Sequence, residues 1–166
     1  MTKTMKSFKT PLRYPGGKSR ALSKLFQFIP DLSNYTEYRE PFLGGGSVAL
    51  EVTKRYPHLK ILVNDLYEPL YNFWREIQDN GHEIKDILLQ LKERHSDPTS
   101  AKQLFLEAKS YLEKDTTETE AVHRAVSFYV VNKCSFSGLT ESSSFSKQAS
   151  ESNFSINGIE KLTGYQ

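Results

Sequence analysis

The sequence EPFLGGGS at residues 40–47, followed by LKILVND at residues 59–65, gives the clearest indication of the fold class. The first stretch completes a short extended segment, Tyr38 to Phe42, and places three glycines before a helix predicted from Ser47 to near Tyr56. The second stretch is a compact apolar run that ends in polar residues, which is typical of a strand buried on both faces of a parallel sheet. Strand, glycine turn, helix and strand together predict a βαβ unit.

The glycine turn and the end of the second strand are candidates for binding a nucleotide-like cofactor. Gly44, Gly45 and Gly46 let the backbone approach a ligand closely, and the helix that follows offers unpaired N–H groups. Asp65 ends the second strand, where a carboxylate can accept hydrogen bonds from both hydroxyls of a ribose. The alternatives are a flexible glycine turn and a helix cap formed by the Asn64-Asp65 pair.

A second glycine motif, RYPGGKSR, occupies residues 13–20 and leads into a helix predicted from Ser19 to Pro30. Lys18 opens this helix although a cation is unfavourable at a helix N-terminus, which suggests that its charge serves a ligand carboxylate or phosphate. Tyr14 is placed to stack on a cofactor or to hydrogen-bond it. The alternative is a plain Pro-Gly turn.

Charge and composition narrow the class of protein. The segment up to Lys24 carries +7 and no acid, so the rest carries −5 within a net charge of +2. Such a basic edge attracts a polyanion, and the alternative is a solvated basic tail. The chain has no apolar stretch of the ~20 residues that a membrane span needs and no signal-peptide core, so we expect a cytoplasmic protein. A single cysteine, Cys134, and four scattered histidines exclude a disulfide framework and a zinc module.

Beyond Asp65 the apolar residues recur at helical spacing and predict a helical region. Three apolar stripes carry this prediction: Ile84, Ile87, Leu88 and Leu91; Leu104, Phe105, Ala108, Tyr111 and Leu112; and Val122, Ala125, Val126, Tyr129 and Val130. Trp74 and Tyr71 are interpreted as core residues rather than as base-stacking residues. The serine-rich segment from Cys134 to Ser155 shows no period and is predicted to be an irregular loop.

The number of predicted strands is small for an α/β protein. Two parallel strands are predicted with clear patterns, whereas an open α/β sheet usually has about five or six. We therefore expect that another polypeptide completes the sheet or that the chain is the N-terminal portion of a longer protein.

Together the motifs resemble the DNA adenine N6-methyltransferases of the Dam type, also called the D12 class. The family's Tyr/Trp-x-Gly-Gly-Lys element matches residues 14–18, and its Glu-Pro-Phe-x-Gly-Gly-Gly-Ser loop matches residues 40–47. Asn64-Asp65 follows the second strand as in the family, and NKCSFSGL at residues 132–139 is similar to its Asn-Arg/Lys-x-x-Phe-x-Gly-Leu element. The resemblance implies an α/β fold with an incomplete, Rossmann-like methyltransferase sheet and a helical target-recognition insertion.

The resemblance also implies how the chain is divided and what it binds. Residues 1–66 would form the cofactor-binding βαβ part, residues 67–155 the helical target-recognition insertion and loop, and residues 156–166 the start of a catalytic half. The implied partner is double-stranded DNA. The implied cofactor is S-adenosylmethionine, with the methionine end at Tyr14 and Lys18, the ribose at Asp65, and the remaining contacts from Phe42, Gly44, Gly45 and Gly46.

Asn132, Lys133, Phe136 and Ser137 are candidate DNA-contacting residues, because a polar, basic and aromatic set at a helix end suits phosphate and base contacts. The alternative is a capped helix end. The family's catalytic Asp-Pro-Pro-Tyr motif is absent, since none of the seven prolines is adjacent to another. We therefore expect no catalytic residue in this chain and no activity of the chain alone. We also expect no metal site, because the cysteine and the histidines show no zinc spacing.

The sequence is also compatible with two other functions. One is a non-catalytic relative that binds DNA or cofactor and regulates another methyltransferase. The other is a split enzyme whose second polypeptide supplies the catalytic strand. In each case the expected compartment is a bacterial or viral-host cytoplasm.

Overall fold

The two predicted strands form a parallel pair in the computed structural model, which describes residues 6, 8–138, 140 and 142–166. Strand β1 (Glu37–Glu40) pairs with β2 (Lys60–Val63), so that Glu37 lies opposite Lys60 and Glu40 opposite Val63. β1 ends before Pro41, which has no N–H group to donate to the ladder. Lys3 of the basic segment and Leu139 of the recognition motif lie outside the described residues.

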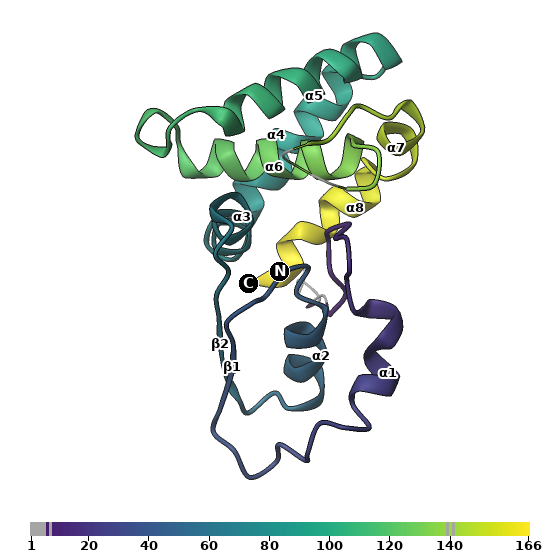
Figure 1. Ribbon diagram of the computed structural model, residues 1–166. Coiled ribbons are helices and arrows are strands. Elements are labelled where there is room, and N and C mark those ends of the chain that lie inside the picture. The colour runs from purple at the N-terminus through teal and green to yellow at the C-terminus, as the bar shows by residue number, and fades with distance from the viewer. Residues whose placement is uncertain (1–5, 7, 139, 141) are drawn as a thin grey trace, which may run out of the picture.

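One face of this sheet is covered by helix α2 (Ser47–Arg55), which follows the glycine turn as predicted (Figure 1). Ile61 and Val63 point toward that helix and are half-buried. Leu62 lies on the opposite face and is 38% exposed. The prediction of a strand buried on both faces is therefore wrong for β2, because within the described ranges no element lies over the Leu62 face.

The first predicted helix is much shorter than expected. Residues 19–30 contain a 3-10 turn, η1 (Ser19–Ala21), and a single helical turn, α1 (Leu22–Leu25), and then leave the helix. Neither element has a side-chain N-cap, and none of their residues is fully buried. An uncapped segment with little apolar surface to bury does not gain enough to extend a helix.

The helices predicted beyond Asp65 are present. They are α3 (Glu68–Asp79), α4 (Gly81–Arg94), α5 (Pro98–Glu113) and α6 (Ala121–Cys134). Ten of the fourteen residues of α6 are buried, so this helix lies at the centre, with α3 and α5 packed against it (Figure 1). Most of the buried core therefore belongs to the helical region and not to the sheet.

The serine-rich segment is more regular than predicted. It contains helix α7 (Lys147–Ser152), and α8 (Ile156–Glu160) follows directly. Ser146 Oγ accepts a hydrogen bond from the Ala149 N–H (3.1 Å), and Ser155 Oγ accepts one from the Gly158 N–H (3.1 Å). The expectation of one irregular loop was wrong because these serines are N-caps of helices too short to show an apolar period.

The last residues cross from the helical region back to the sheet region (Figure 1). α8 packs against α4, and the 3-10 helix η3 (Lys161–Tyr165) packs against α3 and α4. The Tyr165 hydroxyl donates a hydrogen bond to the Lys9 carbonyl. A third 3-10 element, η2 (Thr116–Glu118), links α5 to α6.

In the part of the chain that the structure describes, no helix combines the length and the apolar character needed to cross a membrane. The same residues contain no group of three or more His, Cys, Asp or Glu side chains that could hold a metal ion.

Candidate cofactor and DNA-contact site

Two glycines of the GGG turn make room for aromatic side chains of the chain itself. Gly46 has φ +75°, and a Cβ placed on it would lie 2.5 Å from Cζ2 of Trp74. A Cβ on Gly45 would lie 2.9 Å from the Cβ of Tyr14. Real Cβ atoms do not approach this closely, so both positions require glycine. The sequence indicated close approach of a ligand, whereas these two contacts are made by protein side chains.

Trp74 fixes the glycine turn from the side of helix α3. Its indole Nε1 donates a hydrogen bond to the Gly44 carbonyl (3.1 Å), and the side chain is buried as predicted for a core residue. Tyr71, which was also predicted to lie in the core, is 43% exposed, so the prediction is wrong for this residue. Sequence reasoning missed the role of Trp74 because thirty residues separate it from Gly44.

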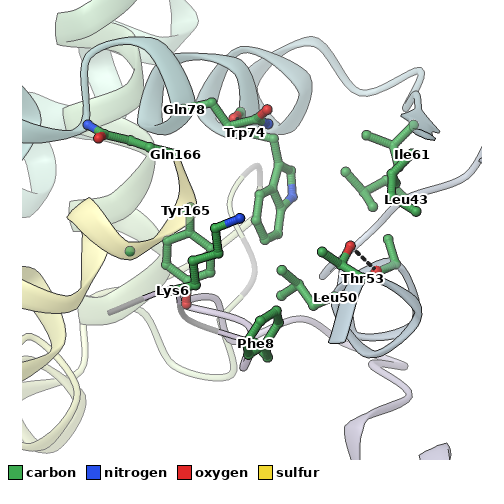
Figure 2. A pocket seen from close by; sticks show the side chains of 14 residues that line it. Lys6, Phe8, Leu43, Leu50, Thr53, Ile61, Trp74, Gln78, Tyr165 and Gln166 are labelled. Carbon is green, nitrogen blue, oxygen red and sulfur yellow. Dashed lines mark hydrogen bonds between the residues drawn. The ribbon is translucent and has the colours of Figure 1, made fainter. Parts of the chain in front are cut away.

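Figure 2 shows the indole of Trp74 standing at one side of a cavity of about 250 Å³ between α2, the sheet and η3. Leu43 and Ile61 line this cavity on the sheet side, Leu50 lines it from α2, and Tyr165 lines it from η3. Neither Tyr14 nor Asp65 belongs to its lining. Of the predicted cofactor residues, Gly46 alone belongs to the lining of this mainly apolar cavity.

Asp65 joins the end of β2 to the glycine turn. Its Oδ2 accepts a hydrogen bond from the Gly44 N–H (2.8 Å), and its Oδ1 accepts one from the Tyr67 N–H (3.1 Å). The second bond caps the turn that leads into α3, which is the alternative role considered for the Asn64-Asp65 pair. An ionised carboxylate has about four acceptor positions, so both oxygens keep lone pairs for a further donor.

Tyr14 lies over the same turn from the N-terminal segment. Its Cε1 atom would be 3.1 Å from a Cβ on Gly44, and its own carbonyl accepts the Gly17 N–H (2.9 Å). Partial burial raises the pKa of the Tyr14 phenol, and the charge of Asp65 raises it further. The hydroxyl therefore stays protonated at neutral pH and can donate a hydrogen bond.

Two predicted cofactor residues lie at the rim of this arrangement. The Lys18 ammonium folds back and donates to the Gly16 carbonyl, on an exposed part of its own turn. The side chain of Phe42 is 82% exposed beyond the end of β1. Tyr14, Asp65 and the glycines thus meet in one place, with Lys18 and Phe42 at its rim, and the cofactor contacts of all these residues stay predictions.

A second cavity, of about 190 Å³, lies between Tyr14 and the predicted recognition element. The Tyr67 hydroxyl and Thr140 Oγ1 share a hydrogen bond at its edge (2.8 Å). Aromatic rings and backbone polar groups around one small space are typical of a site for a flat organic ligand. The residues that line it are Tyr14, Pro15, Tyr67, Phe128, Asn132, Gly138 and Thr140.

Asn132 was predicted to contact DNA, but its side chain is 1% exposed. Its Oδ1 accepts the Arg13 N–H (2.9 Å), and its Nδ2 donates to the carbonyls of Arg13 (2.6 Å) and Gly138 (3.1 Å). The amide therefore faces backbone on both sides and is not presented to a DNA surface. The difference arises because Arg13, 119 residues earlier in the sequence, covers the end of α6.

The other three predicted DNA-contacting residues are differently placed. Phe136 is 72% exposed, and Ser137 next to it is also exposed, with φ +91°. The Phe136 N–H donates to the Ser144 carbonyl (2.9 Å), so the base of the loop is held and its tip projects. Lys133 is half-buried, and burial together with the charge of Arg13 lowers its pKa from 10.5 to about 8.

Comparison with known proteins gives one consistent family. A family model for the D12 class N6 adenine-specific DNA methyltransferase matches residues 14–162. The Type II methyltransferase M.MjaIII of Methanocaldococcus jannaschii is 25% identical over 133 residues, which cover 77% of this chain and 46% of that protein. The DNA N-6-adenine-methyltransferase of Escherichia phage P1 is 28% identical over 128 residues, or 77% of this chain and 15% of that protein.

A third relative, the Type II methyltransferase M1.LlaDCHI of Lactococcus lactis subsp. cremoris, is 26% identical over 129 residues, or 76% of this chain and 41% of that protein. The chain therefore matches less than half of the length of each of these three relatives.

Proposed function

Because the chain belongs to the D12 class N6 adenine-specific DNA methyltransferases, we propose that it is the cofactor-binding and target-recognition part of an enzyme that transfers a methyl group from S-adenosylmethionine to adenine N6 in DNA. The observation that carries this proposal is the junction at Gly44. The Asp65 carboxylate and the Tyr14 ring, from two separate motifs, meet there on one glycine turn.

The residues at this junction fit such a cofactor. When bound, S-adenosylmethionine supplies an electrophilic methyl group on a positively charged sulfur. Asp65 keeps acceptor positions for ribose hydroxyls, although Gly44 and Tyr67 already donate to it. The partly exposed ring of Tyr14 beside that carboxylate gives a cation an aromatic face. Lys18 at the exposed rim can turn from the Gly16 carbonyl toward a ligand carboxylate.

Calorimetric titration with S-adenosylmethionine tests the cofactor site. We expect Asp65→Asn to weaken binding about 5- to 150-fold, the equivalent of about 1–3 kcal/mol for a hydrogen bond to a charged group. Asp79→Asn is the matched control, because Asp79 is an exposed acid that is paired with Arg75 on α3. Equal affinity of Asp65→Asn and wild type would remove Asp65 from the site.

The DNA contact is proposed for the projecting tip formed by Phe136 and Ser137, with Lys133 beneath it. An exposed aromatic ring can stack on a base, and nearby cations contact phosphates. Fluorescence anisotropy of a labelled duplex should show salt-dependent binding that weakens in Phe136→Ala. Phe28→Ala is the control, since Phe28 is equally exposed but lies just beyond α1. Equal losses in both variants would argue against a role for this tip.

Methyl transfer itself is proposed to need the Asp-Pro-Pro-Tyr motif, which this sequence lacks. The amino group of adenine must be held in line with the methyl group, and its developing charge must be stabilised by acceptors. The 166-residue chain should therefore transfer no tritium from labelled cofactor to DNA. Adding a polypeptide that contains the motif should restore transfer. Tritium incorporation that scales with the purified chain alone would contradict this.

The missing motif also favours a second candidate, a binding relative that regulates another methyltransferase without catalysing transfer. The same complementation experiment separates the two. If cofactor and DNA both bind but the added polypeptide restores no activity, the binding function is the better account.

A further inference from the structure

The predicted recognition loop and the predicted cofactor segment are held together by one buried amide. All three hydrogen bonds of the Asn132 side chain go to backbone groups, two on Arg13 and one on Gly138. The side chain of Arg13 adds a further hydrogen bond between the two segments: its Nη1 donates to the Ser135 carbonyl (2.8 Å). The two segments are 119 residues apart in the sequence and are bonded in both directions.

Packing at this contact leaves no room for an intervening atom. Gly138 has φ +74°, and a Cβ placed on it would lie 2.7 Å from the Cβ of Arg13 and 2.8 Å from the Arg13 carbonyl oxygen. The loop therefore rests backbone against backbone on Arg13. A shift of Gly138 must therefore move Arg13 or break the hydrogen bond from Asn132.

Arg13 is followed directly by Tyr14, whose side chain covers the glycine turn. Phe136 is thus joined along the chain to Gly138, which contacts Arg13, and Arg13 is bonded along the chain to Tyr14, which contacts the position of Gly44. Buried polar groups that are fully satisfied hold one arrangement, because each lost partner leaves a costly unpaired group.

We propose that Asn132 is a positioning residue that couples the two ligands: it transmits DNA contact at the Phe136 tip to Tyr14 at the cofactor site. This inference rests on the proposed function. DNA that immobilises the loop should hold Arg13 and Tyr14 in place, so cofactor binds more tightly to the DNA complex. By reciprocity, cofactor must tighten DNA binding by the same factor.

The test compares S-adenosylmethionine affinity with and without a saturating short duplex. In wild type we expect the duplex to tighten cofactor binding at least about fivefold, the lower end of common coupling factors. In Asn132→Ala the ratio should fall close to one. Asn72→Ala is the matched control, because Asn72 is a buried asparagine of α3 whose Nδ2 donates to the Ala121 carbonyl (2.9 Å) away from both segments. It should keep the wild-type ratio.

A second variant guards against a simple loss of folding. Gly138→Ala leaves Asn132 intact but places a methyl group against Arg13, and it should abolish the coupling in the same way. Hydrogen exchange of the ligand-free chain adds a direct readout. Amides of residues 10–18 should exchange faster in Asn132→Ala than in Asn72→Ala, while α3 should be unaffected in Asn132→Ala.

The outcomes separate the two levels of the argument. If wild type binds each ligand singly but shows a ratio of one, or if Asn132→Ala keeps the wild-type ratio, the coupling is overturned and the proposed function stands. If exchange at residues 10–18 is unchanged in Asn132→Ala, the positioning role is overturned without reference to any ligand. Absence of binding to either ligand in the single titrations overturns the proposed function together with this inference.

Discussion

Gly46→Ala is the substitution for which the structure gives the clearest expectation. Gly46 is the N-cap of α2 in a left-handed conformation, φ +75°, and the added methyl group would lie 2.5 Å from the ring of Trp74. The indole cannot move freely, because its Nε1 donates to Gly44 and the side chain is buried. Both the backbone and the packing therefore oppose the change.

The cost has two parts. A left-handed conformation costs a non-glycine residue about 1–2 kcal/mol, and forcing a methyl group into a packed core costs about 1–3 kcal/mol. We expect Gly46→Ala to lower the free energy of unfolding by about 2–5 kcal/mol in total. For a chain of this length that corresponds to a fall in Tm of about 4–20 °C.

Urea unfolding followed by circular dichroism and by fluorescence measures this loss. Trp74 is the one tryptophan of the sequence, so its emission also reports directly whether the indole has moved from the glycine turn. Gly16→Ala is the matched control. Gly16 has φ +72°, but a Cβ on it would meet nothing within 4 Å, so only the conformational cost of about 1–2 kcal/mol applies.

If Gly46→Ala loses no more stability than Gly16→Ala, the contact with Trp74 does not determine why glycine stands at position 46. Unchanged Trp74 emission in a destabilised Gly46→Ala would lead to the same conclusion.

Two further predictions concern charged groups in the helical region. Glu68→Ala leaves the buried guanidinium of Arg124 without its carboxylate, and it should cost about 1.5–3 kcal/mol of unfolding free energy in urea. Asp79→Ala, which breaks an exposed pair with Arg75, should cost less than about 0.5 kcal/mol, and equal losses would contradict the argument. The second prediction concerns Lys133, whose pKa is lowered to about 8 in the folded chain. Between pH 8 and about 10.5 the unfolded chain therefore binds more protons than the folded chain. The contribution of Lys133 to the free energy of unfolding rises with pH over that range. The stability of Lys133→Met relative to wild type should therefore be greatest below pH 8 and shrink above it, whereas a difference that does not change with pH would contradict the assignment.

The parts of the fold that could be predicted from the sequence are those with local signals. The glycine turn, the helix starting at Ser47 and the strands on either side of it all follow from patterns within a few residues. The helices after Asp65 could also be predicted, because apolar residues at helical spacing indicate a helix with one buried face, whichever element covers that face. Serine caps such as Ser146 also act locally, but helices of five or six residues are too short to show a period.

What could not be predicted depends on contacts between distant residues. The apolar pattern of β2 shows what the strand is able to bury, and it does not show that the Leu62 side is uncovered in this chain. Asn132 is of a residue type that often contacts DNA. Only the position of Arg13 reveals that the Asn132 amide is already hydrogen-bonded to backbone. The requirement for glycine at Gly46 was clear, but the reason, Trp74, lies in another element.

The indole of Trp74 has a consequence for how such a protein can be recombined. The sequence division at residue 66 separates a glycine turn from the helical region, yet the side chain that supports Gly44 and Gly46 comes from α3, beyond that division. A chimera joined at residue 66 would bring in a foreign α3 and keep the turn only if the donor supplies an equivalent ring. A junction after Asp79, where α3 ends, would carry the support along with the turn. Exchange of recognition segments between relatives should therefore succeed more often at the second junction, and the inherited unit would be the glycine turn together with α3.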